Sequence, residues 1–209
     1  MSRSALLVVD VQNDFCPGGR LAVPEGHAVI PVVNRALELA SRARLPIYVS
    51  RDWHPSRTRH FKDGGGAWPA HCVQGTPGAA FHPALKLPTK TTLISKGADP
   101  NQDSYSCFDG VAEDRTPFAQ VLRRDGVQEL FLGGLATDYC VQATALDARQ
   151  QGVDVTVLRD AIRGVELHPG DVERALDAMQ RAGVRLETLE QAAPRMTMAS
   201  ARHQAGSHG

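Results

Sequence analysis

The chain has 209 residues, of which 42% are apolar and 22% charged, and its 23 Lys and Arg balance its 23 Asp and Glu. This is the composition of an ordinary globular protein, long enough to bury a core without a disulfide or structural metal. Zero net charge gives no basic surface for nucleic acid or an anionic membrane. No apolar run is long enough for a signal peptide or a membrane span, so we expect a cytoplasmic protein.

Short runs rich in Val, Ile and Leu alternate with helical patterns, which is typical of βαβ units around a parallel sheet. Six strands are predicted, at residues 5–9, 47–50, 91–95, 129–133, 153–158 and 184–189. Helical spacing predicts four helices: one across 29–40, one starting near Thr116, one from about Thr137 to Gly152, and one over 171–182. We expect a single domain over 1–198 and a frayed tail over 199–209.

One connection is too long for this pattern. Residues 51–90 form a stretch of about 40 residues that contains Trp68, Cys72 and four histidines. Connections of this length are mostly functional or disordered, and the aromatic, Cys and His content argues against disorder. We therefore predict a packed loop that binds a ligand.

Polar residues follow directly after several of the predicted strands. In an open parallel sheet, ligands bind in the crevice beyond the carboxyl ends of the strands. If their strands are neighbours, four side chains would meet in that crevice: Asp10, Asp52, Lys96 and Cys140. Two carboxylates, a lysine and a thiol in one cleft would form a reactive group.

Cys140 lies where a strand end, a glycine turn and the first turn of a helix follow one another. An isolated cysteine in a helix is most often a small buried hydrophobe. At a helix start, however, free N–H groups and the helix dipole lower the pKa of a thiol and can hold an oxyanion, so we favour a nucleophile. Asp10, otherwise a turn residue, would then be its base, and Lys96, otherwise a surface charge, would supply a compact cation.

The long loop carries a candidate metal site. Asp52 and His54 are two residues apart in an extended segment, so their side chains point the same way, and His60 and His71 could fold back onto them. One carboxylate and two or three imidazoles suit Zn²⁺, Fe²⁺ or Mn²⁺. Histidines in loops are also often only hydrogen-bonded or solvated, so the pattern alone leaves both interpretations open.

Six motifs in chain order resemble those of the nicotinamidases, whose bacterial members are also called pyrazinamidases, within the isochorismatase-like cysteine hydrolases. The resemblance spans residues 5–189 and rests on DVQNDFCPGG from Asp10, DWHP from Asp52, WPAHCVQGT from Trp68, KG from Lys96, DSYSCF from Asp103 and GLATDYCV from Gly134. It implies an α/β fold of three αβα layers, with a six-stranded parallel sheet in the order 3-2-1-4-5-6. That order would place the strand before Asp10 beside the strand before Cys140.

The resemblance also implies roles for the polar residues. The catalytic triad would be Asp10, Lys96 and Cys140. A divalent metal, Zn²⁺ foremost and otherwise Fe²⁺ or Mn²⁺, would hold the pyridine nitrogen of the substrate and would be bound by Asp52, His54 and His71. His60 matches a further ligand that some members have and others lack.

The same resemblance places the substrate. Its pyridine ring would lie between Phe15, Trp68 and Tyr105. A cis peptide bond between Leu135 and Ala136 would help to aim the N–H groups of Ala136 and Cys140 at the oxyanion. Cys16, Cys72 and Cys107 have no catalytic part in the family pattern.

The implied reaction is hydrolysis of nicotinamide to nicotinate and ammonia in NAD salvage, with pyrazinamide as a further substrate. Cys140 would attack the carboxamide after giving its proton to Asp10, and a water, from the metal sphere or activated by Asp10, would hydrolyse the thioester. One alternative is another isochorismatase-like amidohydrolase or vinyl-ether hydrolase, against which the metal-binding residues argue. A non-catalytic metal-binding or interaction module is the other, and the sequence does not indicate an oligomeric state.

Overall fold

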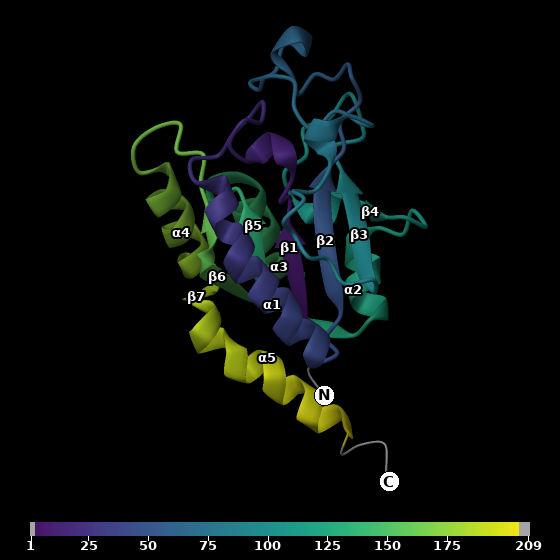
Figure 1. Cartoon of the computed structure of the whole chain (residues 1–209), viewed down its shortest axis with the longest axis vertical. Helices are drawn as coiled ribbons and strands as arrows, with labels where there is room; N and C mark the ends of the chain where they lie inside the picture. Colours follow the sequence, from purple (N-terminus) through teal and green to yellow (C-terminus); the bar gives the residue numbers. More distant parts are fainter. Residues whose placement is uncertain (1–2, 205–209) are drawn as a thin grey trace.

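A seven-stranded sheet forms the centre of the computed structural model, which describes residues 3–204, with side chains as far as Met198 (Figure 1). The strands are arranged in the order β4-β3-β2-β1-β5-β6-β7. Their bounds are β1 (Arg3–Val9), β2 (Ile47–Asp52), β3 (Thr91–Lys96), β4 (Val111–Ala112), β5 (Val127–Leu135), β6 (Asp154–Arg163) and β7 (Arg185–Glu187).

The prediction of a six-stranded, wholly parallel sheet is wrong in one respect. The six predicted strands lie in the predicted relative order, but β4 adds a seventh strand, which pairs antiparallel with β3 at the sheet edge. Its two residues oppose Ile94 and Ser95. Two residues are too few to show an alternating pattern, so β4 leaves no recognisable signal in the sequence.

Five helices cover the two faces of the sheet: α1 (Ile30–Arg42), α2 (Phe118–Arg124), α3 (Gln142–Gln150), α4 (Asp171–Arg181) and α5 (Leu189–Gln204). The side chains of β1 alternate between the two layers. Leu6 and Val8 pack in the cluster with α1 and α5, whereas Leu7 and Val9 pack in the cluster with α2, α3 and α4. Because helices bury both faces, β1 is apolar at every position from Ala5 to Val9.

The end of the chain differs from the prediction. The last strand is shorter than predicted, and Leu189 begins α5, whose buried side chains Leu189, Ala192 and Met196 pack with α1. Their spacing of three and four residues was a helical signal that the strand prediction overlooked. The helix continues to Gln204, into the segment predicted as a tail, and residues 205–209 lie outside the described part of the chain.

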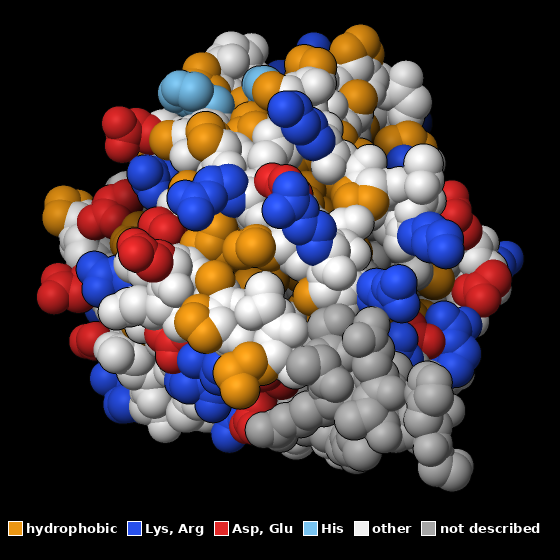
Figure 2. All heavy atoms as spheres, turned by 60° about the horizontal axis from the view of Figure 1, so that its bottom comes forward, with side chains coloured by type: hydrophobic (Ala, Val, Ile, Leu, Met, Phe, Trp, Pro, Cys, Tyr) orange, Lys and Arg blue, Asp and Glu red, His pale blue; other side chains and the backbone are white. Residues whose placement is uncertain are grey.

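Most of the loop from residue 53 to residue 90 covers the carboxyl ends of β1, β2 and β3 and gathers at the top of Figure 1, away from both termini. Its last part returns beside α1, where Asn34 forms hydrogen bonds with Ala84 and Lys86, to the start of β3. Basic, acidic and hydrophobic side chains are interspersed on the face shown in Figure 2. Within residues 3–204, no helix has both the length and the hydrophobicity that crossing a membrane requires. The fold thus places the long loop over the crevice in which the candidate residues were predicted to meet.

Candidate active site

The three candidate catalytic residues meet at the carboxyl ends of three strands. Asp10 directly follows β1, Lys96 ends β3, and Cys140 lies in the π-helical turn Thr137–Val141 that joins β5 to α3. The ammonium of Lys96 is 2.8 Å from Asp10 Oδ2 and 3.4 Å from Cys140 Sγ, and it also contacts Asp52 Oδ1. All four side chains are buried. Lys96 therefore connects the thiol to two carboxylates.

Burial and ion pairing set the charges of this group. Burial alone would lower the pKa of Lys96, but the carboxylates of Asp10 and Asp52 raise it well above its usual range, so the ammonium stays charged. Burial raises the pKa of Asp10, although Lys96 opposes that effect. Ser50 donates a hydrogen bond of 2.7 Å to Asp10 Oδ1 and fixes the orientation of the carboxyl group.

The expected lowering of the Cys140 pKa is wrong for this structure. Burial raises the pKa of the thiol well above its ordinary value, with Lys96 acting in the opposite direction. The start of a helix acts to lower this pKa, but the cost of removing the thiolate from water is larger and raises it. A carboxylate oxygen of Asp10 lies within 4.8 Å of Cys140 Sγ. The thiol of Cys140 therefore lies close to the carboxylate of Asp10, which can take its proton.

Ala136 and Cys140, the expected donors to an oxyanion, stand at the two ends of a short segment that lines the same cavity. The peptide bond between Leu135 and Ala136 is cis, as the resemblance implies. The carbonyl of Ala136 accepts hydrogen bonds from the N–H groups of Tyr139 and Val141, which fold the segment into its tight turn.

Four further side chains form a compact group beside the triad. The nearest nitrogen atoms of His54, His60 and His71 lie within 4.8 Å of one another. Asp52 Oδ2 is 3.6 Å from His54 Nε2 and 3.7 Å from His71 Nε2. Burial acts to raise the pKa of Asp52, but the ammonium of Lys96 and the facing imidazoles of His54 and His71 hold it well below its usual range, so Asp52 is a carboxylate.

The orientation of the three imidazoles fits a divalent metal. Each ring uses Nδ1 for a hydrogen bond to an outer oxygen: His54 to Gly97 O at 3.0 Å, His71 to Pro69 O at 2.8 Å and His60 to Asp103 Oδ1 at 2.8 Å. Such bonds leave Nε2 as the free lone pair. Within the described residues, the buried His54 Nε2 has no hydrogen-bond partner. An unpaired buried nitrogen beside a carboxylate is what a metal ligand requires.

Side chains outside this group hold it in place. The amide of Gln12 makes two hydrogen bonds of 2.8 Å, to the N–H and to the carbonyl of Asp52. Asp14 Oδ2 accepts the N–H of Cys72 at 2.7 Å and so fixes the loop next to His71. Gly97 has φ +71°, and a Cβ there would overlap with the ring of His54. The backbone of Gly97 can approach His54 only because this residue is glycine.

An aromatic cavity is lined by Cys140 and Asp52 at its polar side. Trp68 Nε1 donates a hydrogen bond of 2.9 Å to the hydroxyl of Tyr105, and the ring of Tyr139 stands edge-on to Trp68 with 4.9 Å between ring centroids. Phe15 completes the aromatic lining. The cavity therefore has an aromatic lining beside Cys140.

The Isochorismatase domain profile matches residues 4–191 of the chain. The chain belongs to the isochorismatase family. It is 40% identical to the nicotinamidase of Escherichia coli strain K12, across 90% of this chain and 96% of that protein. It is 41% identical to the nicotinamidase/pyrazinamidase of Mycobacterium tuberculosis, across 87% of this chain and 97% of that protein.

A solved structure shows the same likeness in three dimensions. The pyrazinamidase of Pyrococcus horikoshii in complex with zinc has a TM-score of 0.82 and 44% sequence identity to this chain. The match covers 89% of this chain and 99% of that one. The family and the αβα architecture are therefore common to these proteins.

In this isochorismatase-family chain, the structure brings all the predicted site residues into one region, His60 included. Several residues at the site were missed. Gln12, Asp14, Gly97, Asp103 and Tyr139 all lie inside motifs on which the resemblance rests, so their place in those motifs was the available signal. The cavity also includes Leu21 and Val165, for which the sequence offers no signal.

Proposed function

We propose that this isochorismatase-family chain is a nicotinamidase that hydrolyses nicotinamide to nicotinate and ammonia in NAD salvage, and that it also deamidates pyrazinamide. The observation that carries the proposal is a single cavity in which the thiol of Cys140 lies beside the Lys96–Asp10 ion pair, under aromatic walls and next to the imidazole group. The identity to nicotinamidases over nearly their full length supports the substrate.

The chemistry begins with the thiol proton. Asp10 takes the proton of Cys140, and the ammonium of Lys96, 3.4 Å from the sulfur, stabilises the thiolate. The thiolate attacks the carboxamide carbon, and the N–H groups of Ala136 and Cys140 donate to the oxyanion. Asp10 then gives the proton to the departing amine, which leaves as ammonia, and a thioester remains on Cys140.

Hydrolysis of the thioester reverses these proton movements. Asp10, again a carboxylate, removes a proton from a water molecule that attacks the thioester carbon. The carbon–sulfur bond breaks, the product leaves as nicotinic acid, which ionises to nicotinate in water, and the proton held by Asp10 returns to the thiolate of Cys140. One carboxyl group acts as base and acid in turn, which agrees with its burial and raised pKa.

We further propose that Asp52, His54 and His71 bind a divalent metal, Zn²⁺ in the first place and otherwise Fe²⁺ or Mn²⁺, with His60 as a fourth ligand. The unpaired Nε2 of His54 and the three outer hydrogen bonds to Nδ1 atoms support this assignment. So does the zinc in the pyrazinamidase of Pyrococcus horikoshii. When bound, such an ion supplies a Lewis acid that can coordinate the pyridine nitrogen.

The test is release of ammonia and nicotinate from nicotinamide by purified protein of measured metal content. We expect turnover by the wild-type protein, loss of most activity in Asp10→Asn, because an amide cannot carry the proton, and full activity in Cys16→Ala. Metal-loaded, folded protein that releases no ammonia from nicotinamide would contradict the proposal. It would favour a related amidohydrolase or a binding module instead.

A further inference from the structure

The segment between β6 and α4, residues 164–170, contributes one residue to the lining of the cavity. Val165 lines the cavity together with Cys140 and the aromatic residues. The neighbouring Leu167 is 57% exposed and does not belong to the lining. The mechanism described above uses neither residue, so the segment requires its own explanation.

Asp138 holds this segment against the turn that carries the nucleophile. Its Oδ1 accepts the N–H of Val165 at 2.9 Å, and its Oδ2 accepts the N–H of Glu166 at 2.8 Å. Asp138 is two residues before Cys140 in the same π-helical turn. Hydrogen bonds to an ionised carboxylate are stronger than those between neutral groups. Both carboxylate oxygens thus tie one wall of the cavity to the turn that bears Cys140.

The segment also closes on itself. Glu166 has φ +53°, and its carboxylate accepts the N–H groups of Gly170 at 2.7 Å and Val172 at 3.3 Å. At Gly164 a Cβ would overlap with Val172 and would lie 3.1 Å from Asp138 Oδ1. Only glycine lets the backbone pack this close to the side chain of Val172. These contacts therefore hold the backbone of Val165 in a fixed position.

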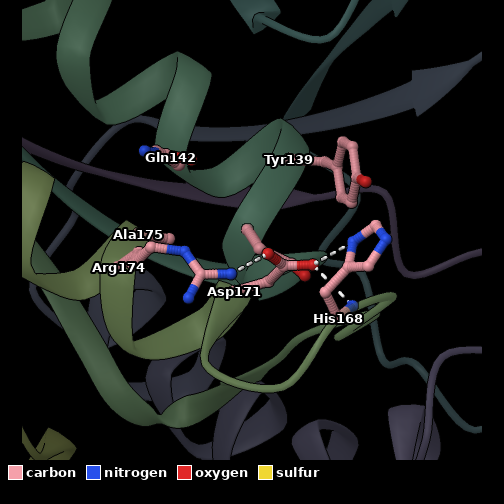
Figure 3. Close-up of a pocket in the computed structure, with 7 residues that line it drawn as sticks. Tyr139, Gln142, His168, Asp171, Arg174 and Ala175 are labelled. Atoms are coloured by element: carbon pink, nitrogen blue, oxygen red, sulfur yellow. Dashed lines mark hydrogen bonds and ion pairs between the residues drawn. The ribbon is translucent and has the colours of Figure 1, made fainter.

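The outer side of the segment is polar, and its groups already have partners. Figure 3 shows Tyr139 beside His168 in a hollow where Asp171 binds both Arg174 and His168. Asp171 is 2.5 Å from Arg174 Nη2 and accepts the N–H of His168 at 2.8 Å. These pairs anchor the segment to α4 from outside, while Val165 is presented to the cavity.

We propose that Val165 determines the size of the ring that the cavity accepts, and that Asp138 is the positioning residue that holds Val165 at its distance from Cys140. This inference rests on the proposed function, since it assumes a flat heteroaromatic carboxamide as substrate. Because its backbone is fixed, the branched side chain of Val165 would overlap with a substituent on the substrate ring and so exclude substituted rings. One methyl group in such a pocket changes kcat/KM by about 10- to 200-fold.

The first experiment compares Val165→Ala with Leu167→Ala, a matched control in the same segment. For each protein, kcat/KM is measured with nicotinamide and with its 2-, 5- and 6-methyl derivatives. We define the ratio as kcat/KM for a methylnicotinamide divided by kcat/KM for nicotinamide. We expect Val165→Ala to raise this ratio by about tenfold for at least one isomer, and Val165→Ile to lower it. Leu167→Ala leaves the ratio unchanged.

The outcomes separate this inference from the proposed function. If the wild-type protein hydrolyses nicotinamide and Val165→Ala leaves all three ratios within about twofold, the assignment of Val165 is overturned while the proposed function stands. If the metal-loaded wild-type protein releases no ammonia from nicotinamide, both are overturned. A changed ratio in Leu167→Ala equal to that in Val165→Ala also counts against a specific role of Val165.

The second experiment tests the role of Asp138 through the same ratio. Asp138→Ala removes both acceptors, so we expect the ratio to shift in the same direction as in Val165→Ala, and the double variant to show little further shift. Asp138→Asn, which keeps one acceptor oxygen, should give an intermediate ratio. A purely structural role would lower kcat for every amide equally and leave the ratio unchanged, and that result would overturn the positioning role.

Discussion

The proposed catalytic triad and the proposed metal-binding group lie side by side but are held in different ways. Asp10 and Lys96 are placed by the ends of β1 and β3, so the hydrogen-bond register of the sheet fixes their distance. His60 and His71 belong to the long loop, and contacts from Asp103 and Pro69 fix their rings. The proposed chemistry therefore depends on the sheet, whereas the proposed metal binding also depends on contacts that orient the histidines of the loop.

Removing the nucleophile should abolish the chemistry and leave the binding of metal and substrate almost unchanged, which is the largest expected difference between the two regions. In Cys140→Ala we expect turnover of nicotinamide to fall by about 10⁴-fold or more, because no other group can form the thioester. Bound metal and nicotinamide affinity should stay close to those of the wild type, since only one small side chain is lost. Ammonia release, metal analysis and a binding titration check these points. Hydrolysis at a rate comparable with the wild type would remove Cys140 from the mechanism.

Lys96 is the contact between the two regions, because its ammonium touches both Asp10 and Asp52. In Lys96→Arg the charge is kept, but a broad planar group replaces a compact one in a buried site. We expect kcat to fall by about 10²- to 10³-fold with the fold preserved, as judged by circular dichroism. An Arg variant with wild-type rates would show that the position requires charge alone.

The difference between the two regions also explains which site residues could be predicted from the sequence. Asp10 ends an apolar run and Lys96 ends another, and strand ends are visible in the hydrophobic pattern. Asp52, His54 and His71 were recognised through residue type and motif. Val165 could not be found this way, because it lines the same cavity as Cys140 only once β6 has paired with β5 in the folded sheet.

Global packing accounts for the other differences from the sequence predictions. The helix-start argument concerns a few backbone groups near Cys140, whereas the raised pKa of its thiol comes from burial by the whole fold. The antiparallel β4 is defined by its pairing with β3 and not by its own two residues. Helix α5 did have a periodic signal, but the strand prediction that ended at Leu189 obscured it.

The metal-binding region should affect the choice of ring more than the chemistry. If the ion binds the pyridine nitrogen, nicotinamide is favoured over benzamide, which lacks that nitrogen but shares the carboxamide. We expect His54→Ala, or removal of the metal, to reduce this preference by about tenfold or more, because the lost interaction exists for only one of the two amides.

Rates with both amides in the metal-loaded and metal-free protein measure this effect, and His82→Ala serves as a control from the same loop. Folding must be checked in each case, since a metal can also stabilise the fold. A preference for nicotinamide that persists undiminished in folded, metal-free protein would show that the aromatic cavity selects the ring.

The smallest effect is expected one layer further out, at Asp103. Its carboxylate accepts from His60 Nδ1 at 2.8 Å, which holds Nε2 toward the other imidazoles. We expect Asp103→Ala to weaken Zn²⁺ binding by about 10- to 100-fold, the usual cost of losing an outer hydrogen bond to a ligating histidine. Asp99→Ala, an exposed carboxylate in the same segment, should leave the affinity unchanged.

A double-mutant cycle decides whether Asp103 acts through His60. The dissociation constant for Zn²⁺ is measured by competition with a chelator in His60→Ala, in Asp103→Ala and in the double variant. If His60 is a ligand held by Asp103, the second substitution adds almost nothing once the imidazole is gone, because the hydrogen bond it removes no longer exists. Additive losses would mean that Asp103 acts on the metal site by another route, such as its charge. No loss in His60→Ala itself would leave Asp52, His54 and His71 as the whole ligand set.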